Sequence, residues 1–296
     1  AVWVPIGVVV NLLAGTYWQN GVREAVGFED EGYGWALVVG LVAAVFAVLG
    51  VLAGRGLRRA TGWIGHRLSR WVPAPVAFVV AAIVVTLVIY LAVTDVLLKG
   101  FSALMNNIYS GTNATTQPGI AQPQVRERSG SPDSLVAWDT LGMEGRNFVA
   151  RGPRPGDLKT FSGREAKEPI RVYVGLDSAA DAKARADLAV QELERTGAFD
   201  RAAIVVAGTT GTGWLEPQTV NTVEYAWNGD TAIVGIQYSF LPSWISTLVD
   251  VDKASGAGAA VFDAVYAKWS SLPAGSRPKL FAYGLSLGSF SLQSAY

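Results

Sequence analysis

Two long apolar stretches dominate the first hundred residues of the chain. Residues 35–54 read WALVVGLVAAVFAVLGVLAG without a charged side chain, and residues 71–98 form a second apolar run. As a helix, about twenty residues rise about 30 Å, which matches the hydrocarbon thickness of a bilayer. We therefore expect two transmembrane helices here, with two buried core helices as the alternative. Residues 1–18 resemble the remainder of an earlier span.

The charges beside these stretches predict the sidedness of the chain. Residues 19–34 carry mainly acidic side chains, whereas residues 55–70 carry arginines and no acid. The acidic residues are Glu24, Glu29, Asp30 and Glu31, and the arginines are Arg55, Arg58, Arg59, Arg67 and Arg70. Because cytoplasmic loops collect arginine and lysine, we expect a cytoplasmic loop at 55–70. Everything after Leu98 then lies outside the cytoplasm.

Beyond residue 168 the pattern changes to short apolar strands that alternate with amphipathic helices. Such alternation predicts a parallel sheet covered by helices. One helix is expected to end at Gly197 and another before Pro273. The expected strands are 170–176, 202–208, 231–239 and 279–284.

These patterns divide the chain into three parts. We expect a transmembrane helical domain at 1–104 and a linker and lead-in segment, rich in small polar residues and proline, at 105–167. Residues 168–296 then form an α/β domain with a parallel sheet.

Composition narrows the possible chemistry. Half of the residues are hydrophobic, 16% are charged and the formal net charge is zero, which fits a lipid bilayer and not a nucleic acid as a partner. The sequence has no cysteine and a single histidine, His66. Disulfides and thiolate metal sites are therefore excluded, and we expect no cofactor and no metal. The oligomeric state stays open.

Residues 284–288, GLSLG, match the G-x-S-x-G elbow of serine hydrolases. A strand leads into the motif and a helix can follow it. Ser286 would stand on a strained turn as the nucleophile, Gly284 and Gly288 would allow close backbone contacts, and the Leu287 N–H would stabilise an oxyanion. An incidental glycine-rich turn is the alternative.

A second oxyanion donor is expected from the loop that follows an earlier strand. Residues 207–214, AGTTGTGW, supply such a loop, and the N–H of Thr210 or Gly211 is the candidate donor. A flexible turn and a phosphate cradle are the alternatives. The apolar segment 240–250 could line an acyl pocket, touch the membrane or simply pack. We interpret Asp250 and Asp252 as solvated helix-start residues, with a role as triad acids as the alternative.

Longer runs carry a resemblance to a known family. The runs EPIRVYVGLDSA, DTAIVGIQYSFLPSW and YGLSLGSF resemble actinobacterial membrane proteins that join a multi-pass N-terminal membrane domain to an α/β-hydrolase catalytic domain. The resemblance spans nearly the whole chain and makes residues 168–296 the N-terminal part of an α/β-hydrolase domain, with a parallel sheet of that type that is incomplete after the elbow. It implies a serine nucleophile at Ser286 and a catalytic domain outside the membrane. The family often has an acidic residue where Leu285 stands.

The partners of the serine are not found downstream of it. In α/β-hydrolases an acid and then a histidine follow the nucleophile, but residues 287–296 contain no Asp, Glu or His. The chain also begins at Ala1, so we expect a fragment of a longer protein, itself almost inactive. The full protein would be a membrane-anchored extracytoplasmic serine hydrolase or acyltransferase for lipid or envelope esters. A hydrolase-like module that binds a lipid or a partner is the alternative.

Overall fold

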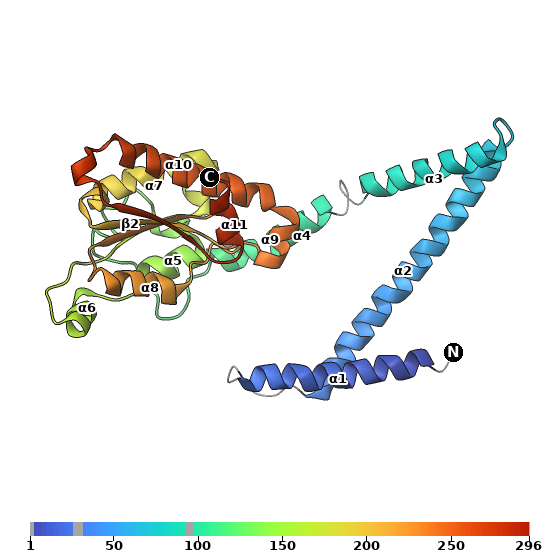
Figure 1. Cartoon of the computed structure of the whole chain (residues 1–296), viewed down its shortest axis with the longest axis horizontal. Helices are drawn as coiled ribbons and strands as arrows, with labels where there is room; N and C mark the ends of the chain where they lie inside the picture. Colours follow the sequence, from blue (N-terminus) through green and yellow to red (C-terminus); the bar gives the residue numbers. More distant parts are fainter. Residues whose placement is uncertain (1–2, 26–31, 93–97, 296) are drawn as a thin grey trace. The chain divides into compact units, whose positions relative to one another are not determined.

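The computed structural model describes residues 3–25, 32–92 and 98–295. The chain forms two compact units, Ala1–Val96 and Leu97–Tyr296, and each is described by itself (Figure 1). Glu29, Asp30 and Glu31, which entered the sidedness argument, lie outside the described residues.

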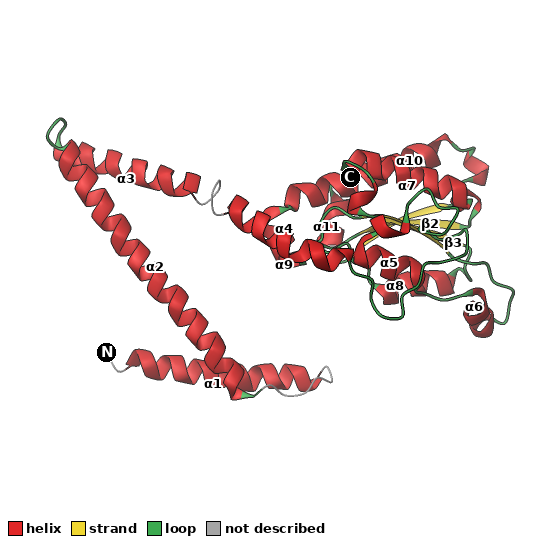
Figure 2. Cartoon of the chain, turned by 180° about the vertical axis from the view of Figure 1, so that it is seen from behind, coloured by secondary structure: helices red, strands yellow, loops and turns green. Residues whose placement is uncertain are grey.

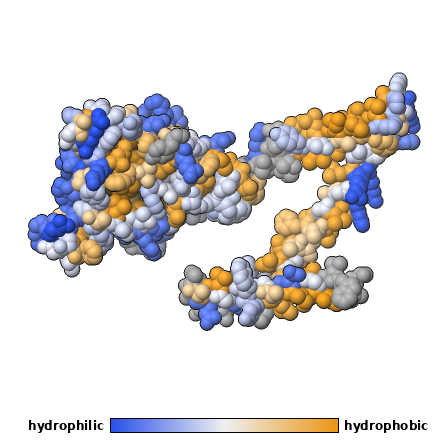
Figure 3. Space-filling model, viewed as in Figure 1, coloured by the Kyte–Doolittle hydropathy of each residue, from blue (hydrophilic) through white to orange (hydrophobic). Residues whose placement is uncertain are grey.

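The first unit consists of the helices α1 (Trp3–Ala25), α2 (Tyr33–Leu68) and α3 (Ala74–Leu91). Among the described helices, α2 and α3 are long and apolar enough to cross a membrane by length and composition. Their large apolar side chains face outward, as Leu41 and Phe46 show with 69% and 70% exposure (Figure 3). Such surfaces are unfavourable in water and favourable against lipid.

The arginine-rich segment 55–70 differs from our expectation of a loop. Helix α2 continues to Leu68, and the turn to α3 occupies only residues 69–73. Arginine is a good helix former, so positive charge does not end a helix, whereas Pro73 blocks its continuation. The arginines therefore lie on a helical extension that follows the apolar part of α2.

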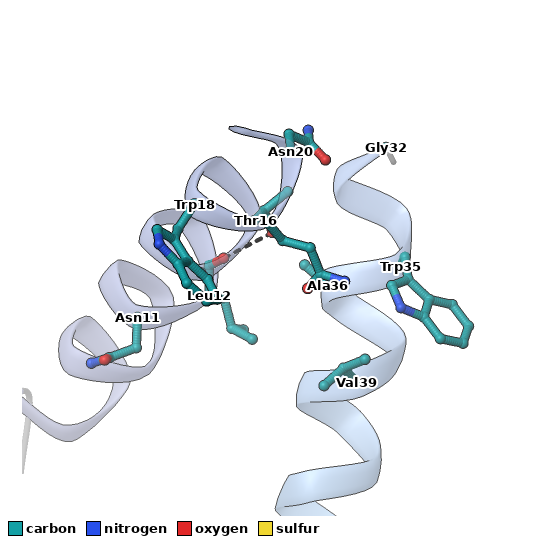
Figure 4. A pocket seen from close by; sticks show the side chains of 11 residues that line it. Asn11, Leu12, Thr16, Trp18, Asn20, Gly32, Trp35, Ala36 and Val39 are labelled. Atoms are coloured by element: carbon teal, nitrogen blue, oxygen red, sulfur yellow. Dashed lines mark hydrogen bonds between the residues drawn. The ribbon is translucent and has the colours of Figure 1, made fainter. Parts of the chain in front are cut away.

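A cavity of about 300 Å³ lies between α1 and α2 within the first unit. Its lining includes Asn11, Leu12, Thr16 and Val39, and the Thr16 hydroxyl donates to the Leu12 carbonyl at 2.9 Å (Figure 4). Leu12 also lies under Gly40, where a Cβ would meet its Cδ1 at 2.9 Å. The cavity thus reflects the close approach of two helices, and none of the described residues that line it is an acid, a base or a histidine.

The second unit is an α/β domain with a four-stranded sheet in the order β1-β3-β2-β4, and all three strand pairs are parallel. Helices α7, α10 and α11 cover one face of the sheet, while α5 and α8 lie on the other (Figures 1 and 2). The strands are β1 (Ile170–Val174), β2 (Ala203–Gly208), β3 (Thr231–Ile236) and β4 (Lys279–Gly284). The helices are α4 (Leu98–Ala114), α5 (Gly142–Ala150), α6 (Pro155–Ser162), α7 (Ala182–Thr196), α8 (Pro217–Ala226), α9 (Ser243–Val249), α10 (Val251–Ser271) and α11 (Leu287–Gln293).

The sequence explains most of these elements. Strands β1, β2 and β3 are buried at every residue, as expected for strands inside a parallel sheet that is covered on both faces. Helix α7 starts where the Asp181 side chain accepts the Ala184 N–H at 2.8 Å. It ends at Gly197, whose φ of 74° is the left-handed conformation that favours glycine. The α/β fold expected from the sequence is therefore confirmed.

The segment 105–167, expected to be a linker and lead-in, is packed onto this domain. Residues 127–129 bond to the outer edge of β1, where the Arg171 N–H donates to the Glu127 carbonyl at 3.0 Å. Arg128 is fully buried, donates to the carbonyls of Val149 and Pro153 and pairs with Glu168. Burial lowers the pKa of Arg128 to about 10, with a further contribution from the Arg171 charge. The segment thus protects a sheet edge that would otherwise be open.

A buried ion pair gives the first test of this packing. The Arg171 Nη2–Glu224 Oε2 distance is 2.6 Å, and both side chains are almost fully buried. Glu224→Gln should lower the free energy of unfolding by about 3–5 kcal/mol, because it leaves a buried charge without its partner. Hydrogen exchange of the β1 and β3 amides in denaturant measures this loss.

The exposed Lys183–Asp187 pair provides the control for that measurement. Asp187→Asn should leave exchange unchanged within error, because water and salt screen an exposed pair. Equal protection in the Glu224→Gln and Asp187→Asn variants would contradict a structural role for the buried pair.

Candidate active site

Ser286 occupies the junction between β4 and α11. Its φ of 54° and ψ of −122° form a backbone conformation that side chains rarely adopt. The serine is exposed, and Leu287 begins the helix immediately after it. As the first residue of α11, Leu287 has no carbonyl within the helix to accept its N–H. The junction therefore offers an exposed hydroxyl next to a free helix terminus.

Both glycines of the motif are needed for close backbone contacts. A Cβ on Gly284 would lie 2.4 Å from the carbonyl carbon and oxygen of Gly288. A Cβ on Gly288 would in turn lie 2.2 Å from the Gly208 carbonyl oxygen. Backbone atoms cannot move aside as a flexible side chain can, so these positions exclude any larger residue.

The elbow, residues 284–288, and the loop expected to supply the second oxyanion donor, residues 207–214 (the donor loop), meet at the carboxyl ends of β2 and β4. These strands are neighbours, and Gly208 pairs with Gly284 in the register. After Gly208 the chain leads to α8 on one face of the sheet, whereas the elbow leads to α11 on the other face. Neighbouring strands whose connections separate in this way create the crevice where open α/β sheets bind ligands.

The structure distinguishes between the two expected donors in this loop. The Thr210 N–H donates to the Trp214 carbonyl at 3.0 Å, so it already has a partner inside the loop. Gly211 lies against the next segment, where a Cβ would meet the Leu241 carbonyl oxygen at 2.5 Å. Because the Thr210 N–H is occupied within the loop, Gly211 stays as the candidate oxyanion donor, and both roles stay predictions.

A buried polar cluster behind Gly211 was missed by the sequence reasoning. Asp250 is 2% exposed, so our expectation that it is a solvated helix-start residue is wrong, whereas Asp252 is exposed as expected. Ser239 Oγ donates to Asp250 Oδ2 at 2.7 Å and lies 3.3 Å from Ser246 Oγ. Ser246 Cβ would touch a Cβ on Gly211 at 2.9 Å. The cluster thus packs against Gly211 and supports the donor loop. Its only signal in the sequence is a pair of serines, Ser239 and Ser246, in an apolar segment that ends at an acid, Asp250.

Tyr238 lies beside this cluster and is also buried. Burial raises the pKa of its phenol, and the nearby Asp250 carboxylate raises it further. Its hydroxyl has no hydrogen-bond partner among the described residues. The phenol therefore stays neutral and can donate a hydrogen bond.

A cavity of about 260 Å³ begins at the far end of the donor loop, beside Trp214 and Leu215. Glu144 and Asn147 of α5 and Asn221 of α8 also line it. Burial raises the pKa of the Glu144 carboxyl, against smaller opposing effects of Asn147 and Arg151. Sequence reasoning missed this cavity because half of its lining comes from the segment expected to be a linker.

The second unit contains no histidine that could serve as the general base of a serine nucleophile. His66, the single histidine, is exposed on α2 in the first unit. The described residues contain no group of three or more His, Asp or Glu side chains that could hold a metal ion.

Two family patterns match the sequence. The pattern described as the alpha/beta-hydrolase family matches residues 170–296, and that described as the N-terminus of the alpha/beta-hydrolase family matches residues 1–153. The chain belongs to the alpha/beta-hydrolase family. No curated protein and no solved structure matches it. For this α/β-hydrolase, membership indicates a hydrolase-like function, while the reaction depends on its own site.

Alanine substitutions at two glycines of α10 test whether the close packing of α10 on α11 stabilises the elbow. A Cβ on Gly258 would lie 2.0 Å from the Ser291 carbonyl oxygen of α11, whereas a Cβ on Gly256 would meet nothing within 4 Å. Gly258→Ala should force α10 and α11 apart and lower the free energy of unfolding by about 1–3 kcal/mol. Gly256→Ala should be neutral or slightly stabilising, because alanine favours a helix. Thermal unfolding compares them, and equal midpoints would refute this account.

Asp250 and Asp252 form a second matched pair. Asp250→Ala removes the acceptor of the buried Ser239 hydroxyl and should cost about 1–3 kcal/mol of stability. Asp252→Ala removes an exposed carboxylate and should change little. Hydrogen exchange of the loop 209–214 reports the difference, and an unaffected loop in the Asp250→Ala variant would show that the cluster does not support it.

Proposed function

We propose that this α/β-hydrolase is a membrane-anchored serine hydrolase or acyltransferase that acts outside the cytoplasm on lipid or cell-envelope esters. The observation that carries the proposal is the backbone of Ser286, a non-glycine residue held at positive φ between a strand and a helix. Strain of this kind gathers at functional sites, where it presents a reactive side chain.

The proposed chemistry proceeds through an acyl-enzyme. Ser286 Oγ attacks the ester carbonyl and gives its proton to a general base, which forms a tetrahedral oxyanion. The C–O bond to the leaving group then breaks while the base returns this proton to the departing alcohol, and the acyl group stays on Ser286. The Leu287 and Gly211 N–H groups stabilise the oxyanion that forms during this attack. Water then releases the acid, or an acceptor hydroxyl takes the acyl group, and Ser286 regains its proton.

Two features support the location. Helices α2 and α3 could cross a membrane, and the arginines of α2 follow its apolar part. By the tendency of positive charge to stay in the cytoplasm, that end of α2 faces inward. Helix α3 then returns the chain to the outside, where the α/β domain meets envelope esters.

A fluorophosphonate probe tests the nucleophile. The protein from its native membranes should become labelled on the peptide that contains Ser286, because the probe phosphorylates an activated serine. Ser286→Ala should abolish the labelling, whereas Ser289→Ala, three residues further along the same turn, should retain it. Mass spectrometry of the labelled peptide measures both, and labelling at another serine would overturn the assignment.

Probe labelling of the native protein and of the chain 1–296 is compared to locate the general base of Ser286. Labelling of the native protein but not of the chain 1–296 would place the base outside these residues. A folded native protein that resists the probe would favour the second candidate, a domain that binds a lipid or a partner without catalysis. The observation behind this candidate is that the second unit contains no histidine.

A further inference from the structure

Two helices of the second unit expose large apolar side chains to solvent. On α4, Leu104 and Ile108 are 55% and 54% exposed, and on α9, Trp244 and Leu248 are 63% and 62% exposed. In each helix the two residues are four apart and therefore share a face. We call these four side chains the apolar rim.

The end of α4 is fixed to the carboxyl edge of the sheet. Asn113 is buried, and its Oδ1 accepts from Gln237 Nε2 at 2.9 Å, one residue beyond the end of β3. Arg146 Nη2 donates to the Asn113 carbonyl at 3.0 Å. These bonds hold α4 against the edge on which the elbow opens.

Helix α9 belongs to the same edge, because it follows β3 after a short connection. Its inner face is buried through Ile245 and Ser246, and its first turn contacts Gly211 of the donor loop. Both helices lie at the same end of the unit (Figures 1 and 2). Leu285, next to Ser286 in the elbow at this edge, is also 44% exposed.

The chain itself indicates what covers the rim. Six residues separate the end of α3 from the start of α4. The chain from Leu91 to Leu98 covers at most about 25 Å at about 3.6 Å per residue, so α4 begins shortly after any span that α3 makes. If α3 spans the membrane, α4 starts at the bilayer surface, where tryptophan and exposed apolar faces are typical.

We infer that the apolar rim is a lipid-docking surface, which seats the carboxyl edge of the sheet, with Ser286, against the outer face of the bilayer. The inference rests on the membrane anchoring of the proposed function and not on the reactivity of Ser286. It identifies the substrate class further, because a site in this position meets esters that lie at the headgroup level of a membrane.

The absence of cysteine from the sequence makes a direct test possible. Single variants Leu104→Cys and Leu248→Cys of the full chain are labelled with a fluorophore and placed in phosphatidylglycerol–phosphatidylethanolamine nanodiscs. Phe161→Cys is the matched control. Phe161 is 74% exposed, and its neighbour Ser162 bonds to Asn228 at the opposite, amino edge of the sheet.

Spin-labelled lipid should quench the fluorophores at 104 and 248, and aqueous iodide should quench them several-fold less than the one at 161. Iodide quenching as strong at 104 and 248 as at 161 would overturn the inference. Protection from iodide without quenching by lipid would also overturn it, and would indicate a second protein copy on the rim. Failure to enter nanodiscs would refute the anchoring as well, whereas probe labelling of Ser286 on the same samples reports the chemistry separately.

Discussion

The backbone contact between Gly208 and Gly288 is the constraint on which the carboxyl edge of the α/β domain depends. Strands β2 and β4 are neighbours, and their loops leave toward opposite faces. The elbow can turn this sharply only if α11 starts directly against the end of β2, where a Cβ at 288 would meet a carbonyl oxygen at 2.2 Å. Gly258 of α10 allows the same kind of approach to the Ser291 carbonyl oxygen of α11. Glycines at 208, 288 and 258 thus bring β2, α11 and α10 into backbone contact.

Buried arginine side chains attach the segment that precedes the sheet to the rest of the domain. Arg128 and Arg171 extend into the protein and bind carbonyl oxygens of the segment that precedes the sheet. Arg146 does the same for the end of α4. Each guanidinium presents several donors in one plane, which suits carbonyl groups that no helix or strand has paired. The lead-in is therefore held by these arginine bonds together with its own apolar side chains, since Leu141, Phe148 and Val149 are buried in the core of the domain.

The distance along the chain over which a signal acts explains what the sequence could and could not predict. The strands at 170–174, 203–208 and 279–284 follow from short apolar runs, and Gly197 marks a helix end, because these signals are local. The docking of residues 113–168 depends on arginines whose partners lie far along the chain. Asp250 was misread for a related reason, because it is buried against Ser239, a residue from before α9, while its own local pattern is that of an exposed helix start. At the site, the elbow was visible as a motif, while the support behind Gly211 was not.

The strain at Ser286 is the point at which structure bears most directly on function. Among the described non-glycine residues, Asn228 and Ser286 have positive φ. Asn228 has a structural reason, because it closes a turn with Gly229, accepts from Ser162 and is of a type that tolerates this conformation. Ser286 has none, and its ψ of −122° lies outside the left-handed helical region. Such strain costs about 1–3 kcal/mol. A glycine would relieve it, so a serine in this conformation is the feature that makes residue 286 the candidate for the proposed nucleophile.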